Sequence, residues 1–272
     1  MIQLRPGPLA MTLAALIAVF LLMPLISVIP VSFTPNRYLS VPEGEWSLRH
    51  YQALIENPIW AQGFWLSIRV GVVASALATA LATAFALGIW MIQPRFAGLL
   101  MGLALLPMVA PPVVSALTLY FFLITLSKVN NFVAYDTWAG VALAHSVMIA
   151  PFAVVLVSVA LSQLDRRIDL AARSMGAGVA TRVFRVILPN IRFTLITALF
   201  LTFVLSWDEI GVTLFITSVN AVTLPRLMWM GLRDNIDPAI AAISVVLIAI
   251  VVTVILAKTV IERTRARRQE RA

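Results

Sequence analysis

Long apolar runs separated by short polar connections dominate the chain. A helix needs about 20 mainly apolar residues to cross the hydrocarbon core of a membrane. Six stretches meet that length, and they are residues 9–33, 63–92, 97–126, 138–162, 193–217 and 239–260. No linker rich in glycine and serine divides them. The pattern therefore predicts an all-α integral membrane protein, with six transmembrane helices in a single domain over residues 1–272.

The basic residues indicate which side of the membrane each connection faces. With the N-terminus in the cytoplasm, 14 of the 20 lysines and arginines fall on the inner side, as the positive-inside rule requires. Both termini and the loop 163–192 are then cytoplasmic. Loops 34–62, 127–137 and 218–238 are periplasmic. The net charge of +8 is explained by topology and lipid headgroup contacts rather than by nucleic-acid binding.

Composition agrees with a chain that lies in lipid. Hydrophobic residues make up 61% and charged residues only 12%, against about a quarter charged in ordinary soluble proteins. No cysteine is present, which excludes disulfides, thiolate metal sites and cysteine nucleophiles.

Two of the predicted spans carry helix breakers or an ionisable residue. The third span contains Pro107, Pro111 and Pro112, which predict a kinked or broken helix. That break is either a gate or a passive kink. The fourth span contains His145. A histidine at this depth is a functional candidate, for example in a gate, or it is hydrogen-bonded to a neighbouring helix.

Two adjacent carboxylates lie deep in the fifth span. Asp208 and Glu209 come about 15 residues into it, roughly 22 Å along a helix axis. In a continuous helix one polar face would hold Thr202, Ser206, Glu209, Thr213 and Thr217. We expect Glu209 to face a polar path with Ser206 and Thr213, and Asp208 to pair with a donor on another helix. Such a path suits a cationic solute, although both carboxylates could equally be tied into interhelical hydrogen bonds.

The outer segment 218–238 is amphipathic. A short helix is predicted over residues 224–232, with Trp229 and Met230 at the membrane interface. It is a candidate docking surface for a soluble partner.

One polar stretch, residues 165–192, is too long to be a simple turn and carries six arginines. A helix is predicted over residues 165–175, glycines follow at 176 and 178, and a second helix is predicted over residues 179–187. The first helix has a small apolar face made of Ile168, Ala171, Ala172 and Met175. That face can be buried in a groove of a partner protein or lie on anionic lipid.

The spacing Ala171-Ala172-x-x-x-Gly176, followed by Val186-x-Leu188-Pro189, resembles the EAA loop of ABC-importer permeases. Two positions depart from the family pattern. Leu170 stands in place of the glutamate, and Val186 stands in place of an isoleucine. Asp169 could supply the acid, although from a different helical face. The resemblance implies contact with an ATPase for Asp169, Leu170, Ala171, Ala172, Arg173, Met175, Gly176, Leu188 and Pro189.

The stretches LPMVAPPVV, AHSVMIAPF and SWDEIGVTLF are similar to the spermidine/putrescine permease branch of that family. The resemblance implies a type I importer permease in the bacterial inner membrane. It would work with a second permease subunit, expected to be a paralogue, two ATPase subunits and a periplasmic substrate-binding protein. ATP and Mg²⁺ would bind the ATPase, because this chain has no glycine-rich phosphate-binding loop and no expected cofactor of its own.

Other functions are compatible with parts of this pattern. Related permeases carry aminoethylphosphonate, opines and amino-acid derivatives, or iron complexes. A secondary transporter is a more distant alternative, for which we find no convincing internal repeat. A membrane enzyme would need a nucleophile–base pair or metal ligands, yet the chain has two histidines and no cysteine.

Overall fold

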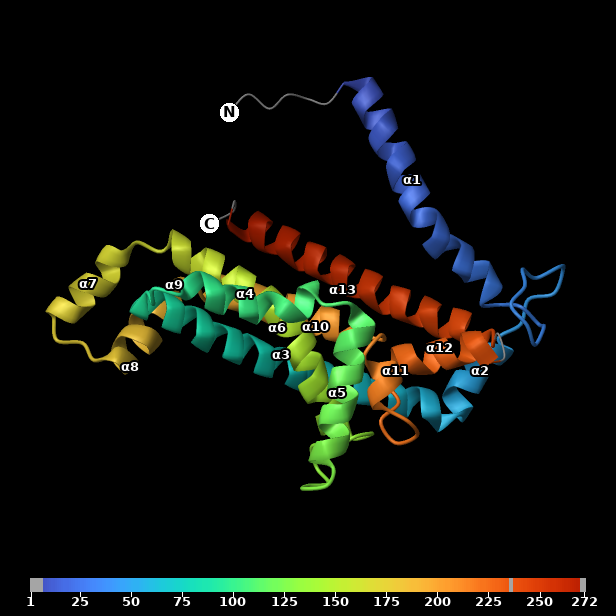
Figure 1. Ribbon diagram of the computed structural model, residues 1–272. Coiled ribbons are helices and arrows are strands. Elements are labelled where there is room, and N and C mark those ends of the chain that lie inside the picture. The colour runs from blue at the N-terminus through green and yellow to red at the C-terminus, as the bar shows by residue number, and fades with distance from the viewer. Residues whose placement is uncertain (1–6, 235–236, 270–272) are drawn as a thin grey trace. The chain divides into compact units, whose positions relative to one another are not determined.

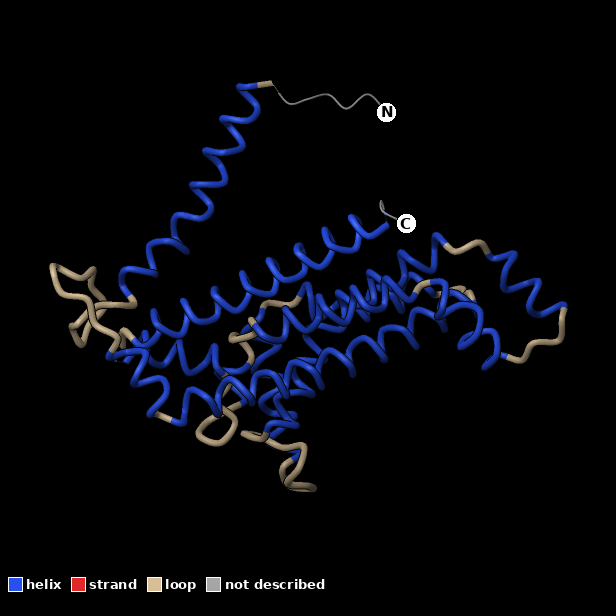
Figure 2. The backbone as a smooth tube through the Cα atoms, turned by 180° about the vertical axis from the view of Figure 1, so that it is seen from behind, coloured by secondary structure: helices blue, strands red, loops and turns tan. Residues whose placement is uncertain are grey.

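The computed structural model describes residues 7–234 and 237–269, which form helices and loops without a strand (Figure 2). The all-α class is therefore confirmed. The described residues form two compact units. One unit contains α1 (Pro8–Val31), α2 (Arg49–Glu56) and α13 (Ala239–Gln269), and the other unit spans Gln62–Leu227.

Four described helices are long and apolar enough to cross a membrane alone. They are α1, α3 (Pro58–Ile92), α6 (Trp138–Gln163) and α13 as far as Val260. Two further pairs pass the same test together but are bent. The pair α4 (Ala97–Val109) and α5 (Pro112–Leu126) bends by 98°, and Val179–Asn190 with α10 (Arg192–Trp207) bends by 75°. If each bent pair of helices is counted as one span, the described residues contain six candidate spans, which is the number that the sequence predicts.

The break between α4 and α5 lies where the prolines predict it. Ala110 is extended, as a residue before proline prefers, and Pro111 separates the two helices. Pro112 is the first residue of α5. Proline is tolerated there because the N–H group that it lacks would have no hydrogen-bond partner in the first turn of a helix. Pro107 stays inside α4.

The fifth predicted span, residues 193–217, is not one continuous helix. α10 ends at Trp207 with Asp208 as its C-cap, and only the short α11 (Thr213–Ile216) follows. Hydropathy and helical spacing did not reveal this break, because the sequence there contains no proline. Gly211 lies within it.

Small residues on α3 allow the helices of the larger unit to pack closely. Ala74, Ala78, Ala82 and Ala86 are all at most 2% exposed. A Cβ on Gly71 would come within 2.9 Å of the Phe203 ring, so the backbone of α3 lies directly against α10. In lipid such close van der Waals contact replaces the hydrophobic drive that holds helices together in water.

The smaller unit is organised around the loop that follows α1. The ring of Phe33 packs against Trp46 and Tyr51 at centroid distances of 5.7 and 5.3 Å. The side chain of His50, buried in α2, is 3.0 Å from the carbonyl oxygen of Asn36. α1 itself has no buried residue.

The carboxylate of Asp136 joins two loops in the larger unit. It accepts hydrogen bonds from the backbone N–H groups of residues 218 to 221 and from the Asn220 side chain, at 2.7 to 3.2 Å. Burial raises the pKa of Asp136, but the four backbone donors outweigh it and leave the pKa below 3.8. The lowered pKa means that the ionised carboxylate stabilises the loop at neutral pH, and this contribution is lost as pH falls through the lowered pKa.

Asp136→Asn should therefore lower the free energy of unfolding by about 1 kcal/mol at pH 7. The carboxylate offers two acceptor oxygens to the loop N–H groups, whereas the amide offers one oxygen and places an NH₂ donor against the remaining N–H groups. The measurement is thermal unfolding of the purified protein in detergent. Glu56→Gln, at an exposed position in α2, removes the same charge as a control. Equal midpoints for the two variants would show that Asp136 does not stabilise the loop.

Candidate functional site

The polar stretch forms a helix–turn–helix segment in the larger unit (Figure 1). α7 (Arg166–Ser174) begins at the N-cap Asp165, whose carboxylate accepts a hydrogen bond from the Arg167 N–H at 2.9 Å. Gly176 then reverses the chain with φ +80°, a left-handed conformation that favours glycine. The return consists of α8 (Val179–Thr181), η1 (Arg182–Ile187) and α9 (Leu188–Asn190). Both predicted helices are present, but η1 is a π-helix, which the sequence did not indicate.

A buried ion pair joins the two arms of this segment. The Arg182 Nε and Nη2 groups donate to Asp169 Oδ1 and Oδ2, each at 2.6 Å. The side chains of Asp169 and Arg182 are only 11% and 10% exposed. Such a two-point contact fixes orientation as well as distance. Asp169 is thus paired with Arg182 within the chain.

The outward surface of α7 is apolar. Ile168, Leu170, Ala171 and Met175 are exposed, and Met175 is 80% exposed. Ala172, which we expected on the same outward face, is instead buried at 3% because it lies on the side that holds Asp169. Phe184 on η1 is also exposed, but it lines a separate groove formed with α3 and α10. A solvent-facing patch of this kind marks a surface that another molecule covers.

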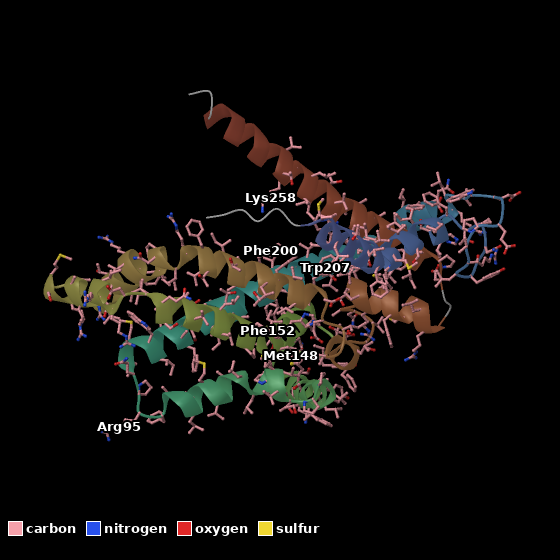
Figure 3. All side chains as sticks on the ribbon, turned by 90° about the horizontal axis from the view of Figure 1, so that it is seen from above. Arg95, Met148, Phe152, Phe200, Trp207 and Lys258 are labelled. Carbon is pink, nitrogen blue, oxygen red and sulfur yellow. The ribbon has the colours of Figure 1, made fainter. Side chains whose placement is uncertain are left out.

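A second feature is a cavity of about 370 Å³ beside the break between α4 and α5. Its apolar wall comes from that break, residues 107–112, and from α6 and α10. Figure 3 shows Met148 and Phe152 along α6, and both line the cavity together with Ile149 and Leu205. Glu209 is the ionisable residue in the lining. The structure thus brings the predicted prolines and Glu209 to one place.

The break after α10 orients the Glu209 carboxylate. Its Oε1 accepts a hydrogen bond from the Val212 N–H at 2.9 Å, and the described part of the chain supplies no donor to Oε2. Asp208 does not line the cavity. Its side chain is exposed at the C-cap of α10 and pairs with no described residue. We had expected it to pair with a donor on another helix.

His145 connects the two sides of the same break. Its Nδ1 is 2.9 Å from Ser206 Oγ and its Nε2 is 2.8 Å from Thr213 Oγ1. The Thr213 hydroxyl donates its single proton to the Glu209 carbonyl at 2.8 Å. Nε2 must therefore donate to Thr213, and Nδ1 accepts from Ser206. These are the interhelical hydrogen bonds we considered for His145. Ser206 and Thr213 are buried in this network and do not line the cavity.

Sequence reasoning missed the partner of Asp169 and most of the cavity wall. Arg182 is 13 residues from Asp169, across a glycine turn, and such a pairing is visible only once the turn is built. Met148, Ile149 and Phe152 lie within the stretch that contains His145. Their spacing is that of one helical face, which was a usable signal.

The comparisons with known proteins agree with this architecture. The profile of the family described as "Binding-protein-dependent transport system inner membrane component" matches residues 84–266, more than half of the chain. The match includes the helix–turn–helix segment and the residues that line the cavity.

Several characterised or named proteins are similar over most of their length. The "Putrescine transport system permease protein PotI" of Escherichia coli is 28% identical over 235 residues, covering 85% of this chain and 83% of that protein. The "Spermidine/putrescine transport system permease protein PotC" of Haemophilus influenzae is 24% identical, covering 90% and 92%. The "Probable molybdenum ABC transporter permease protein" of Haloferax volcanii is 33% identical, covering 68% and 71%.

A solved structure has the same fold. It is described as a bacterial ABC transporter involved in the import of the acidic polysaccharide alginate, and one of its chains matches with a TM-score of 0.67 at 14% identity. The match covers 90% of this chain and 93% of that chain. Profile, relatives and fold agree that this is a multi-pass inner membrane transport subunit rather than an enzyme. The chain belongs to the family of binding-protein-dependent transport system inner membrane components, the permeases of ABC importers.

Proposed function

We propose that this permease imports a polyamine such as putrescine or spermidine, or a related small cationic solute. The observation that carries this proposal is the Glu209 carboxylate in the wall of a cavity whose other lining side chains are apolar. Two relatives named for putrescine or spermidine transport support it.

The chemistry of the cavity suits a polyamine. An ammonium group gains more from a carboxylate that is partly enclosed by protein than from one in bulk water, because the effective dielectric constant there is lower. The methylene segments between ammonium groups suit the apolar wall formed by Met148, Ile149 and Phe152. Pro111 and Pro112 form the break that borders the cavity, Pro107 lines it from the last turn of α4, and we assign all three to a gate. His145, with Ser206 and Thr213, holds the opposite side in position.

We assign the coupling function to the helix–turn–helix segment. Its exposed apolar residues on α7 would insert into a groove on an ATPase subunit. Arg173, also exposed, would lie at the edge of that contact. The ion pair between Asp169 and Arg182 makes α7 and η1 move together. Leu188 and Pro189 in α9 then join η1 to α10, at whose end Glu209 lies.

The proposed assembly contains this chain, a second permease subunit that is a paralogue, two ATPase subunits and a periplasmic binding protein. Residues 1–272 act in it as one transmembrane domain. ATP and Mg²⁺ bind the ATPase subunits. The competing solutes are aminoethylphosphonate, opines or amino-acid derivatives, and iron complexes.

Uptake by the reconstituted assembly tests the solute. Labelled putrescine or spermidine should enter proteoliposomes only with ATP and the binding protein, and excess unlabelled polyamine should compete. Uptake of one of the competing solutes with no competition by polyamines would refute the polyamine assignment. Uptake driven by a proton gradient without ATP would indicate a secondary transporter instead.

Glu209→Gln should lower polyamine uptake about tenfold or more, since a charge-assisted hydrogen bond contributes about 1.5–3 kcal/mol. The measurement is initial uptake rate at equal amounts of assembled transporter. Asp208→Asn removes the same charge one residue away, outside the cavity lining, and should lower uptake less. Unaltered uptake by the Glu209 variant would mean that the carboxylate is structural or that the solute is not cationic.

Gly176→Ala should weaken coupling, because a left-handed backbone costs a residue with a Cβ about 1–2 kcal/mol. Gly178→Ala is a matched control. A Cβ meets no atom within 4 Å at either position, but only Gly176 has a positive φ. Copurification of the ATPase and transport-coupled ATP hydrolysis should fall for the Gly176 variant and change little for the Gly178 variant. Equal ATPase copurification and equal ATP hydrolysis for the two variants would show that the turn at Gly176 has no function in coupling.

A further inference from the structure

A second cavity, mostly apolar but with several polar groups, lies where the arginine-rich connection 163–192 meets the helices of the larger unit. Its volume is about 450 Å³. It lies between the C-terminal end of α3, the beginning of α4, the last two turns of α6 and the first residue of α7. The positive-inside rule places this end in the cytoplasm. Nothing in the transport path described above uses this cavity.

The wall of this cavity contains a hydroxyl group without a partner. Ser158 Oγ is buried and makes no hydrogen bond to any described residue. A helical serine usually bonds a carbonyl of the preceding turn, as Ser162 does to Val159 at 2.7 Å. An unpaired buried hydroxyl costs free energy, and it is satisfied when a ligand or water accepts its proton.

A cation lines the cavity. The Arg166 guanidinium is 5.3 Å from the centre of the Trp90 ring, which also lines the cavity, and this contact stabilises its position. Gln93 adds an amide and has a left-handed backbone (φ 52°) that ends α3 sharply. Ala97, the first residue of α4, brings a helix N-terminus with its partial positive charge.

Negative groups are also near, and they do not cancel this arrangement. α3 and α6 end here and contribute partial negative charge. The Asp165 carboxylate is adjacent in sequence, but it is exposed and accepts the Arg167 N–H as the cap of α7. The full charge of Arg166, the Ser158 hydroxyl and the Gln93 amide leave a site with a net preference for an anion with several acceptor oxygens.

We propose that this cavity binds a phosphate group at the cytoplasmic surface of the membrane. Phosphate oxygens accept hydrogen bonds from a guanidinium, a hydroxyl and an amide together. The apolar part of the wall, with Ile89, Met101 and Leu161, suits the glycerol and acyl portion of an anionic phospholipid. Basic pockets between transmembrane helices on this side are typical headgroup sites. A free phosphate ion would use the same donors without the apolar wall.

The test uses the complete transporter assembly, purified in detergent and depleted of lipid. Native mass spectrometry then counts bound phosphatidylglycerol, with phosphatidylcholine as the zwitterionic comparison and inorganic phosphate as the competitor. We expect retention of phosphatidylglycerol over phosphatidylcholine. Arg166→Gln should lower that retention about fivefold, the equivalent of about 1 kcal/mol per basic residue, and Ser158→Ala should lower it in the same direction.

Arg167→Gln is the matched control, because it removes the same charge from the adjacent residue of α7, which does not line the cavity. Its lipid retention should fall clearly less than that of Arg166→Gln, because it can contribute only the general attraction of a basic residue near the membrane surface. If inorganic phosphate displaces the bound lipid from the unsubstituted protein but not from Arg166→Gln, the phosphate group that the cavity binds is that of the free ion. Equal retention of the two lipids with no effect of phosphate, or equal losses for the Arg166 and Arg167 variants, would overturn the proposal.

Discussion

Backbone hydrogen bonding inside the bilayer is the constraint on which the rest of this structure depends. A helix can be interrupted at membrane depth only where protein or water covers the freed backbone groups. Among the described residues, two such interruptions border the Glu209 cavity, at Pro111 and after Trp207. α6 lies beside both, and its His145 bonds Ser206 and Thr213 across the second. The cavity with Glu209 exists because the two breaks face one helix.

The same arrangement connects the cavity to the cytoplasmic segment. The break after α10 lies at one end of that helix, and α9 and η1 lie at the other end. The Asp169–Arg182 ion pair makes η1 and α7 one body. In the coupling we propose, a displacement of α7 by an ATPase would reach α10 and the Glu209 carboxylate through these contacts.

Local chemistry was predictable from the sequence, and long-range pairing was not. Apolar length predicted the spans, and Pro111 and Pro112 predicted the first break, because proline acts on its own backbone. The glycine at 176 predicted the turn for the same reason. The second break has no proline, so helical periodicity wrongly continued through residues 208–212. The partners of Asp136 and Asp169 lie 82 and 13 residues away, and their pairing depends on how loops approach in space.

From the connection of α7 to α10 we propose, as the central claim, that movement of α7 by the ATPase opens the Glu209 cavity to alternate sides of the membrane. The chain has no cysteine, so a single Met148→Cys variant reports on the cavity directly. The measurement is its rate of reaction with a membrane-impermeant maleimide in proteoliposomes, with Val219→Cys in an exposed outer loop as the reference. Trapping the ATPase with ATP and vanadate should raise the rate from the periplasmic side and lower it from the cytoplasmic side. Equal rates in the resting and trapped states would contradict the account.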